Sequence, residues 1–188
     1  MSGKLIIITA PSGAGKTTIV KHLLAHIPSL RFSVSATTRS PRANEADGID
    51  YYFISETDFK KHIAANHFLE WEEVYPGRFY GTLQSEVERL WSQGMHVVFD
   101  IDVIGAIHLQ EKYPAESLSL FIAPPSLEIL EQRLMLRKTE SPQMLQTRME
   151  RAAMELSKKD LFDMVIVNDN LDTACRQAHA RVLEFISG

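Results

Sequence analysis

The chain has 188 residues, of which 45% are hydrophobic, and a formal net charge of −4. This length and composition allow one well-buried core with small inserts, so we expect a single α/β domain. The small acidic excess, 24 against 20 basic residues, gives no overall attraction to nucleic acid or to an anionic membrane. The apolar runs are too short to cross a membrane, and a strand follows Met1–Lys4 without a signal peptide, so we expect a cytoplasmic protein.

A glycine-rich segment, A-P-S-G-A-G-K-T at residues 10–17, lies between an apolar run and a helix-like segment. A buried strand, such a turn and a helix N-terminus direct backbone N–H groups toward one point, which suits a polyphosphate. In this pattern Lys16 reaches the β- and γ-phosphates and Thr17 holds Mg²⁺. The usual first glycine is Ala10 here, which is tolerable if its φ is negative. The alternative, a chance glycine turn, does not explain why strand, loop, Lys-Thr and helix follow in order.

Short apolar runs alternate with amphipathic segments along the chain, as in an α/β fold. The predicted strands are residues 5–9, 32–35, 96–101, 118–122 and 164–167. The predicted helices are residues 17–26, 56–66, 83–93, 103–112, 127–137, 142–158 and 171–186. Residues 50–54 and 68–75 are aromatic and strand-like around one short helix, for which Ser55 and Asp58 provide a start. The pattern therefore predicts a parallel core of five strands with a small mixed-sheet insert.

Two arginines follow the second predicted strand. Arg39 and Arg42 are three residues apart with a proline between them, and the phenol of Tyr51 comes shortly after. The planar donors of arginine match a phosphate monoester better than lysine does. Taken alone, the pattern fits a surface loop of solvated arginines equally well. The phosphate loop in the same chain favours a second anion site.

Two aspartates lie at the end of the predicted strand at 96–101: Asp100, then Asp102 after one residue. An aspartate at the carboxyl end of a parallel strand beside a phosphate loop can hold Mg²⁺ directly or through water. We therefore expect Thr17 and Asp100 to be the metal ligands. None of the seven histidines has the spacing of a zinc site.

The segments S-x-S-x-T-T-R-x-P-R, G-x-D-Y, F-L-E-W, Y-G-T and V-N-D occur in an order that resembles the guanylate kinase family. The resemblance runs from Leu5 to about Phe185 and implies the fold of P-loop nucleoside monophosphate kinases. It implies a core of about 1–34, 83–132 and 159–188, a GMP-binding insert of about 35–82, and a helical lid of about 133–158. The implied reaction is phosphorylation of GMP, and of dGMP, by ATP with Mg²⁺.

The resemblance also implies a set of site residues. The ATP-binding residues would be Ala10, Pro11, Ser12, Gly13, Ala14, Gly15, Lys16, Thr17, Thr18 and Asn168. The GMP-binding residues would be Ser35, Arg39, Arg42, Tyr51, Glu70, Tyr80, Thr82 and Asp102. The catalytic residues would be Lys16, Arg39, Arg133, Arg137 and Arg148.

Glu70 has a chemical reason to select guanine. Guanine presents N1–H and N2–H₂ as adjacent donors that one carboxylate can accept, whereas adenine would leave a partly buried carboxylate unpaired. Without the arginine loop, an exposed acid on an edge strand would be the simpler interpretation of Glu70.

The lid arginines have an ordinary alternative as well. Arg133 and Arg137 are four apart and share a helix face, but Glu128 and Glu131 offer intrahelical partners. Two further positions depart from the family pattern: Ile104 replaces a frequent glutamine, and Lys138 a frequent glycine.

Two other functions compete with the kinase hypothesis. One is a non-catalytic interaction module with the same fold, against which the intact Gly15, Lys16 and Thr17 argue. The other is a phosphate-loop kinase for another phosphomonoester such as a sugar phosphate, against which Glu70 and Thr82 argue. The sequence leaves a homo-oligomer open.

Overall fold

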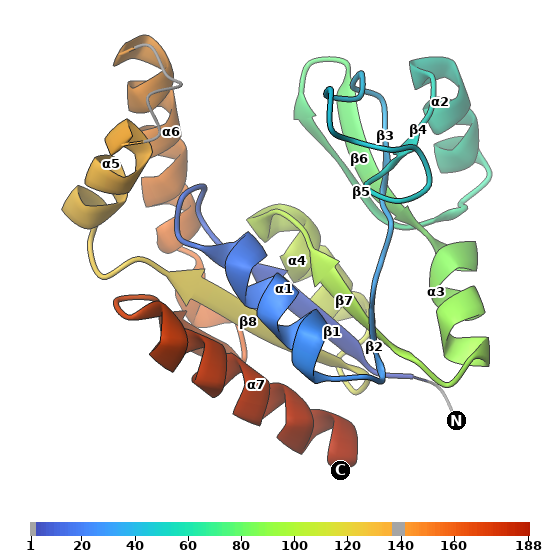
Figure 1. The fold of residues 1–188 in the computed structure, drawn as a ribbon. Helices are drawn as coiled ribbons and strands as arrows, with labels where there is room; N and C mark the ends of the chain where they lie inside the picture. Colours follow the sequence, from blue (N-terminus) through green and yellow to red (C-terminus); the bar gives the residue numbers. More distant parts are fainter. Residues whose placement is uncertain (1–2, 137–141) are drawn as a thin grey trace.

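The structure is a computed structural model that describes residues 3–136 and 142–188, with side chains from residue 144 onward in the second range. Its centre is a five-stranded parallel sheet in the order β2-β7-β1-β8-β9 (Figure 1). The strands are β1 (Leu5–Thr9), β2 (Leu30–Phe32), β7 (His96–Asp100), β8 (Ser117–Ala123) and β9 (Met164–Val167). The predicted five-stranded parallel core is confirmed.

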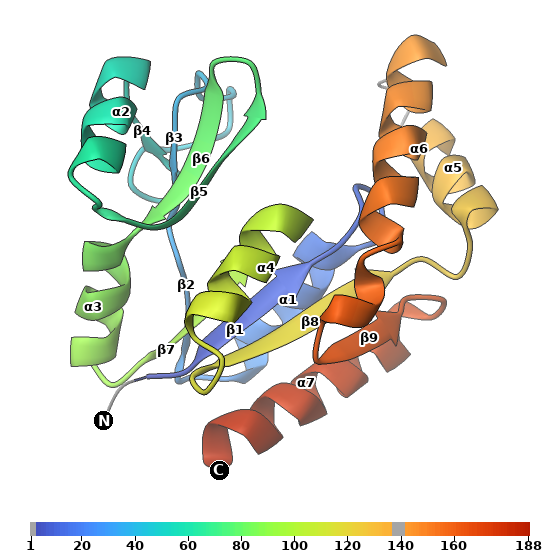
Figure 2. The same cartoon turned by 180° about the vertical axis from the view of Figure 1, so that it is seen from behind.

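Helices cover both faces of this sheet, which is why its strands are almost continuously apolar. Side chains alternate across a strand, so Ile6 and Ile8 pack toward one face and Leu5 and Ile7 toward the other. The flanking helices are α1 (Lys16–His26), α3 (Gln84–Ser92), α4 (Val103–Lys112) and α7 (Leu171–Ser187). Helices α1 and α7 lie on the first face (Figure 1), and α4 lies on the second (Figure 2).

A second, mixed sheet in the order β4-β3-β6-β5 lies to one side of the parallel sheet. Its strands are β3 (Ala36–Thr37), β4 (Tyr52–Phe53), β5 (Phe68–Tyr75) and β6 (Arg78–Leu83), and α2 (Glu56–Ala64) covers it. Phe59 of α2 stacks on Phe68 with ring centroids 4.3 Å apart, which gives the sheet a small aromatic core of its own. The Ser55 hydroxyl accepts the backbone N–H of Asp58 at the start of α2, as predicted.

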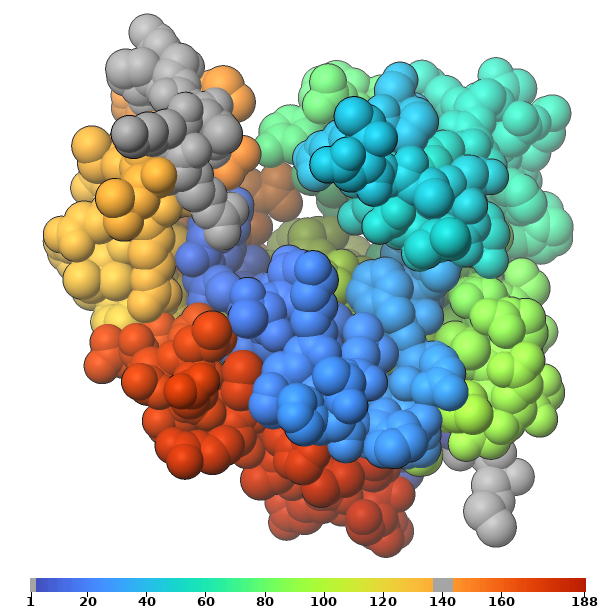
Figure 3. Space-filling view, in the orientation of Figure 1, coloured from blue at the N-terminus to red at the C-terminus, as the bar shows by residue number. Residues whose placement is uncertain are grey.

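Two helices project on the opposite side, α5 (Leu127–Leu136) and α6 (Pro142–Leu156), followed by η1 (Lys159–Leu161) (Figure 2). They pack on each other through Leu130, Leu134 and Ala152. The surface is hollowed between this pair and the mixed sheet (Figure 3). The loops that follow β1 and β7 line this hollow, as expected for the carboxyl edge of a parallel sheet.

The second core strand differs from the prediction. We expected residues 32–35, but β2 spans Leu30–Phe32, because residues 33–35 carry the chain from one sheet to the other. The Ser33 N–H still donates to Val98 of the first sheet, whereas the Ser35 carbonyl accepts from Tyr52 of the second. No helix among the described residues is both long and apolar enough to span a membrane.

Candidate active site

The phosphate loop after β1 has the backbone that its glycines allow. Gly13 and Gly15 have φ values of 97° and 99°, in the left-handed region that favours glycine. Among the described residues, Asn66 is the one non-glycine with positive φ, so Ala10 lies outside that region. Alanine at position 10, where the pattern usually has glycine, therefore causes no backbone strain.

The helix that follows the loop begins without a side-chain cap. By contrast, side chains of Ser55, Asp102 and Asn170 accept backbone N–H groups at the starts of α2, α4 and α7. Uncapped N–H groups at the positive end of a helix dipole attract an anion. Helix α3 also begins without a side-chain cap, but the uncapped start of α1 is the one that lines the cleft at the phosphate loop.

Asn168 supports the phosphate loop from behind. Its side-chain amide donates to the Ala14 carbonyl at 2.7 Å, and the residue is only 5% exposed. A methyl group on Gly15 would come within 2.2 Å of the same amide. Arg133 donates to the Asn168 backbone carbonyl at 2.9 Å. Asn168 thus binds the base of the loop, Arg133 binds Asn168, and neither is among the residues that line the cleft.

The loop lysine is turned toward the end of β7. Lys16 Nζ lies 2.5 Å from Asp100 Oδ1 and donates to the Ile101 carbonyl at 2.9 Å. Thr17, the next residue, is exposed at the cleft. The predicted ammonium therefore lies beside one of the two predicted metal ligands, Asp100, whereas Thr17 lines the cleft on the phosphate loop.

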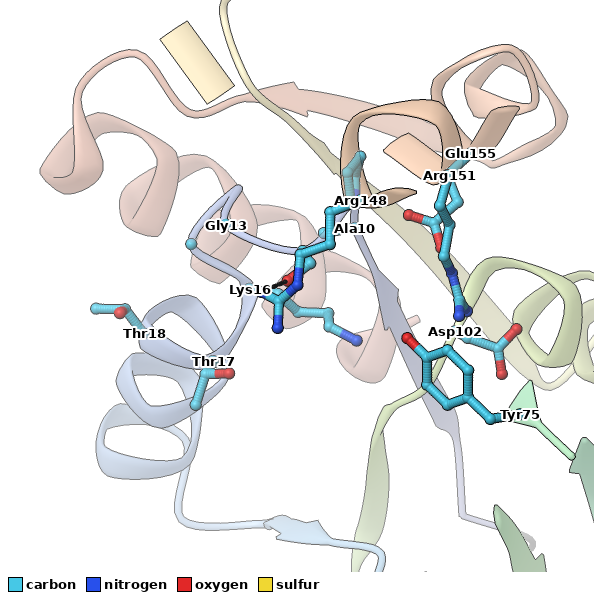
Figure 4. A pocket seen from close by; sticks show the side chains of 13 residues that line it. Ala10, Gly13, Lys16, Thr17, Thr18, Tyr75, Asp102, Arg148, Arg151 and Glu155 are labelled. Atoms are coloured by element: carbon cyan, nitrogen blue, oxygen red, sulfur yellow. Dashed lines mark hydrogen bonds and ion pairs between the residues drawn. The ribbon is translucent and has the colours of Figure 1, made fainter. Parts of the chain in front are cut away.

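A cleft of about 370 Å³ lies between the phosphate loop and α6 (Figure 4). It is lined by residues 10–13 and 15–18 together with Tyr75, Asp102, Arg148, Arg151 and Glu155. Arg148 extends over the loop and approaches Ser12 Oγ at 3.4 Å. Arg137, which we expected to accompany it, lies outside the described residues.

A second cavity, of about 150 Å³, opens beside the first. It is lined by Ser35, Tyr51, Glu70, Val74, Tyr80, Gly81, Asp100, Ile101 and Asp102. Asp102 lines both cavities, and its Oδ1 is fixed by the backbone N–H groups of Ile104 and Gly105. Asp102 is thereby the N-terminal cap of α4. Because both bonds come from backbone N–H groups, having Ile104 in place of the frequent glutamine does not disturb this cap.

Glu70 is a buried carboxylate without a full set of partners. It is 8% exposed, and its Oε1 has no hydrogen-bond partner among the described residues. Burial raises the pKa of Glu70 to about 7, opposed by hydrogen bonding to Thr82. The Ser35 and Thr82 hydroxyls lie 3.5 Å apart near it. A buried acceptor left unpaired costs stability and implies a ligand with donors.

The two predicted phosphate arginines differ in the structure. Arg39 forms two bonds of 2.6 Å to Glu45 and lies over the Tyr51 ring, whereas the Arg42 side chain is 78% exposed. The Arg39 bond lowers the pKa of Glu45 to about 2. Tyr51 and Tyr80 contact each other edge to face at 5.9 Å. The cation and both phenols therefore form one cluster, with Arg42 at its rim.

Comparison with known proteins assigns the family. The family model described as Guanylate kinase matches residues 2–184. The chain belongs to the guanylate kinase family. A guanylate kinase of Salinibacter ruber is 48% identical over 183 residues, covering 97% of this chain and 97% of the relative. One of Bacteroides fragilis is 48% identical over 97% of this chain and 90% of the relative.

A solved structure agrees with the guanylate kinase assignment. The crystal structure of guanylate kinase from Anaplasma phagocytophilum superposes with a TM-score of 0.80 at 29% identity, covering 100% of this chain and 88% of that chain. The five-stranded sheet with its mixed-sheet insert is thus the fold of a guanylate kinase.

Sequence reasoning missed several residues of these sites, including Val74, Gly81 and Ile101 of the second cavity. Tyr75, Arg151 and Glu155 line the cleft, and Glu45 holds Arg39. Two spacings could have indicated the charged ones: Glu45 follows Arg42 by three residues, and Glu155 follows Arg151 by four. Oppositely charged residues three or four apart are ordinary neighbours on helix surfaces, so the spacing alone does not separate a site residue from a surface ion pair.

Proposed function

We propose that this protein transfers the γ-phosphoryl group of ATP to GMP and releases ADP and GDP. The observation that carries the proposal is the pair of adjoining cavities, one on a phosphate loop and one on a buried, unpaired carboxylate. Phosphoryl transfer requires donor and acceptor held close together with the moving charge neutralised, which adjoining cavities allow. Membership in the guanylate kinase family supports GMP as the acceptor.

The larger cavity is assigned to ATP. The N–H groups at the start of α1 and the Lys16 ammonium bind its phosphates, while Asn168 acts through the loop that it supports. The Lys16–Asp100 ion pair opens when the ammonium moves to the phosphates.

The oxygen donors beside the loop fit Mg²⁺. Thr17 offers a hydroxyl and Asp100 a carboxylate, and Mg²⁺ prefers one or two such protein oxygens with nucleotide phosphates and water. No group of three His, Cys, Asp or Glu side chains within the described ranges forms a metal site, so the nucleotide supplies the remaining ligands. When bound, the ion neutralises charge on the β- and γ-phosphate oxygens.

The smaller cavity is assigned to the guanine base of GMP. Ionised Glu70 accepts N1–H and N2–H₂, and the Ser35 and Thr82 hydroxyls with Asp102 complete the base site. The GMP phosphate is bound by Arg39, Arg42, Tyr51 and Tyr80. Arg39 is the fixed member of this set, held in place by Glu45 and the Tyr51 ring.

The division of the chain belongs to the same proposal. We assign residues 35–82 to GMP binding, 133–158 to a lid that excludes water, and the remainder to the core. Arg133, Arg137 and Arg148 are the proposed lid arginines, and Arg148 already reaches the loop. A cytoplasmic location and a homo-oligomer remain expectations from the sequence.

An acceptor screen tests the proposed function. The chain, ATP and Mg²⁺ are incubated with GMP, dGMP, AMP, UMP or ribose 5-phosphate, and ADP release is measured. We expect turnover with GMP and dGMP. Preference for ribose 5-phosphate would identify a sugar-phosphate kinase, and failure to bind Mg-ATP in calorimetry would identify a non-catalytic module.

A further inference from the structure

Arg151 and Glu155 lie in the wall of the cleft above the phosphate loop, outside the set of expected site residues. Both are on α6, three and seven residues after Arg148. Positions spaced by three and four residues share one helix face. That face of α6 therefore presents two guanidinium groups and one carboxylate to the cleft.

Glu155 binds the Nε side of the Arg151 guanidinium group. Arg151 Nε donates to Glu155 Oε1 at 2.8 Å, and the side chains are 34% and 7% exposed, respectively. Burial by itself lowers the pKa of Arg151, but the bond to Glu155 and the Glu155 charge, with smaller contributions from Tyr75 and Asp102, outweigh it and raise the pKa. The guanidinium stays charged, and no partner of its two terminal amino groups is recorded among the described residues.

The free edge of Arg151 points into the molecule. Figure 4 shows its guanidinium directed toward Asp102 and the Tyr75 ring, whose centroid lies 5.9 Å from Arg151 Cζ. Asp102 lines both cavities, and Tyr75 ends β5 of the mixed sheet. Arg151 is therefore at the junction of the two cavities.

A purely structural role explains this pair poorly. The Glu155 carboxylate is largely buried, and the desolvation cost of burying it offsets much of the attraction between the two charges. A planar guanidinium held at Nε with both terminal amino groups available suits two-point recognition of phosphate.

We propose that Arg151 binds phosphate oxygens of the nucleotide on the phosphate loop and that Glu155 is the positioning residue that presents its guanidinium. The proposal rests on the proposed use of ATP in this cleft. Arg151 then adds a cation to Lys16 and Arg148 on the side of the cleft that faces the acceptor cavity.

The test removes the positive charge of Arg151 and keeps a polar side chain. Arg151→Gln is compared with Arg181→Gln, a matched control because Arg181 pairs with Glu184 on α7 away from both cavities. We expect Arg151→Gln to lower kcat/KM for ATP by ~100-fold and to weaken an unreactive ATP analogue in calorimetry by ~10-fold, with KM for GMP unchanged. A loss of kcat/KM smaller than ~10-fold relative to the control overturns the proposal. Thermal unfolding confirms that both variants are folded at the assay temperature.

A double-mutant cycle tests the role of Glu155. If Glu155 acts only by holding Arg151, Arg151→Gln with Glu155→Gln loses no more activity than Arg151→Gln alone. Losses that multiply overturn the positioning role. Should the wild-type chain bind the analogue but not phosphorylate GMP, the proposed function fails, while weaker analogue binding by Arg151→Gln still supports the phosphate contact.

Discussion

The two cavities of this protein are built in different ways. The phosphate-loop cavity depends mainly on backbone, namely left-handed glycines and an uncapped helix, and the Asn168 side chain supports the loop from behind. The acceptor cavity depends on side chains that come from distant parts of the chain, between Ser35 and Asp102. Its main hydrogen-bond acceptor, Glu70, has one oxygen without a partner among the described residues. A backbone site is complete before its ligand arrives, whereas the side-chain site retains an unsatisfied group that selects the ligand.

The largest effect is expected from the lysine of the phosphate loop. Lys16→Ala removes the ammonium that reaches the phosphates, and we expect kcat to fall by on the order of 1,000-fold or more. Steady-state ADP release with GMP measures it. Lys21→Ala is the matched control, because Lys21 is an exposed lysine on the same helix. A loss below ~10-fold would show that the loop backbone suffices.

The preference for GMP over AMP should depend on the second cavity instead. Glu70→Ala removes the acceptor for the guanine N–H groups, so we expect the ratio of kcat/KM for GMP over AMP to fall by ~100-fold. Glu72→Ala is the matched control, because Glu72 is an acidic residue on the same strand as Glu70 but is not among the residues that line the acceptor cavity. It should leave the ratio unchanged. An unchanged ratio in Glu70→Ala would contradict the guanine assignment.

This contrast also explains what the sequence could predict. The loop pattern, its flanking strand and helix, and the five parallel strands follow from local order and apolar runs. Two of the strands in the mixed sheet, β3 and β6, were not predicted. Ala36–Thr37 has only two residues, and Arg78–Leu83 mixes charge, aromatic rings and glycine, so neither has a clear strand period.

Hydrogen bonds between side chains and residues far away in the sequence could not be predicted. The Asn168 amide binds a loop carbonyl 154 residues earlier, which no local pattern encodes. The resemblance implied that Asn168 is an ATP-binding residue, and its observed bond links it to the phosphate loop. Arg39 was predicted as a phosphate ligand, but its bonds to Glu45 depend on the path of the loop between them.

The pH dependence of the acceptor cavity should follow Glu70. Burial raises the pKa of Glu70 from its ordinary 4.5 to about 7, so the folded chain binds this proton more tightly than the unfolded chain. The stabilisation is complete below pH ~4.5 and is lost as pH rises through ~7, by about 3 kcal/mol in all. Chemical unfolding from pH 4.5 to 8 measures it, and Glu70→Gln should lack this contribution.

GMP binding should change in the opposite direction. Because the base needs ionised Glu70, we expect the affinity for GMP to rise ~10-fold between pH 6 and 8 as the carboxyl loses its proton. Calorimetric titrations of the wild type and Glu70→Gln separate this effect from titration of the GMP phosphate itself. The same pH dependence in both proteins would contradict the role of Glu70.

The smallest effect is expected where the loop departs from the usual pattern. Ala10→Gly restores the family residue, but Ala10 is buried and free of left-handed strain, so glycine gains no new conformation that the loop needs. We expect kcat/KM for ATP to stay within ~2-fold, while the free energy of unfolding falls by about 0.5–1 kcal/mol through the greater entropy of glycine in the unfolded chain. Steady-state kinetics and urea unfolding measure the two quantities. A large gain in activity would mean that the Ala10 methyl group limits how closely the loop approaches the phosphates, and would contradict this expectation.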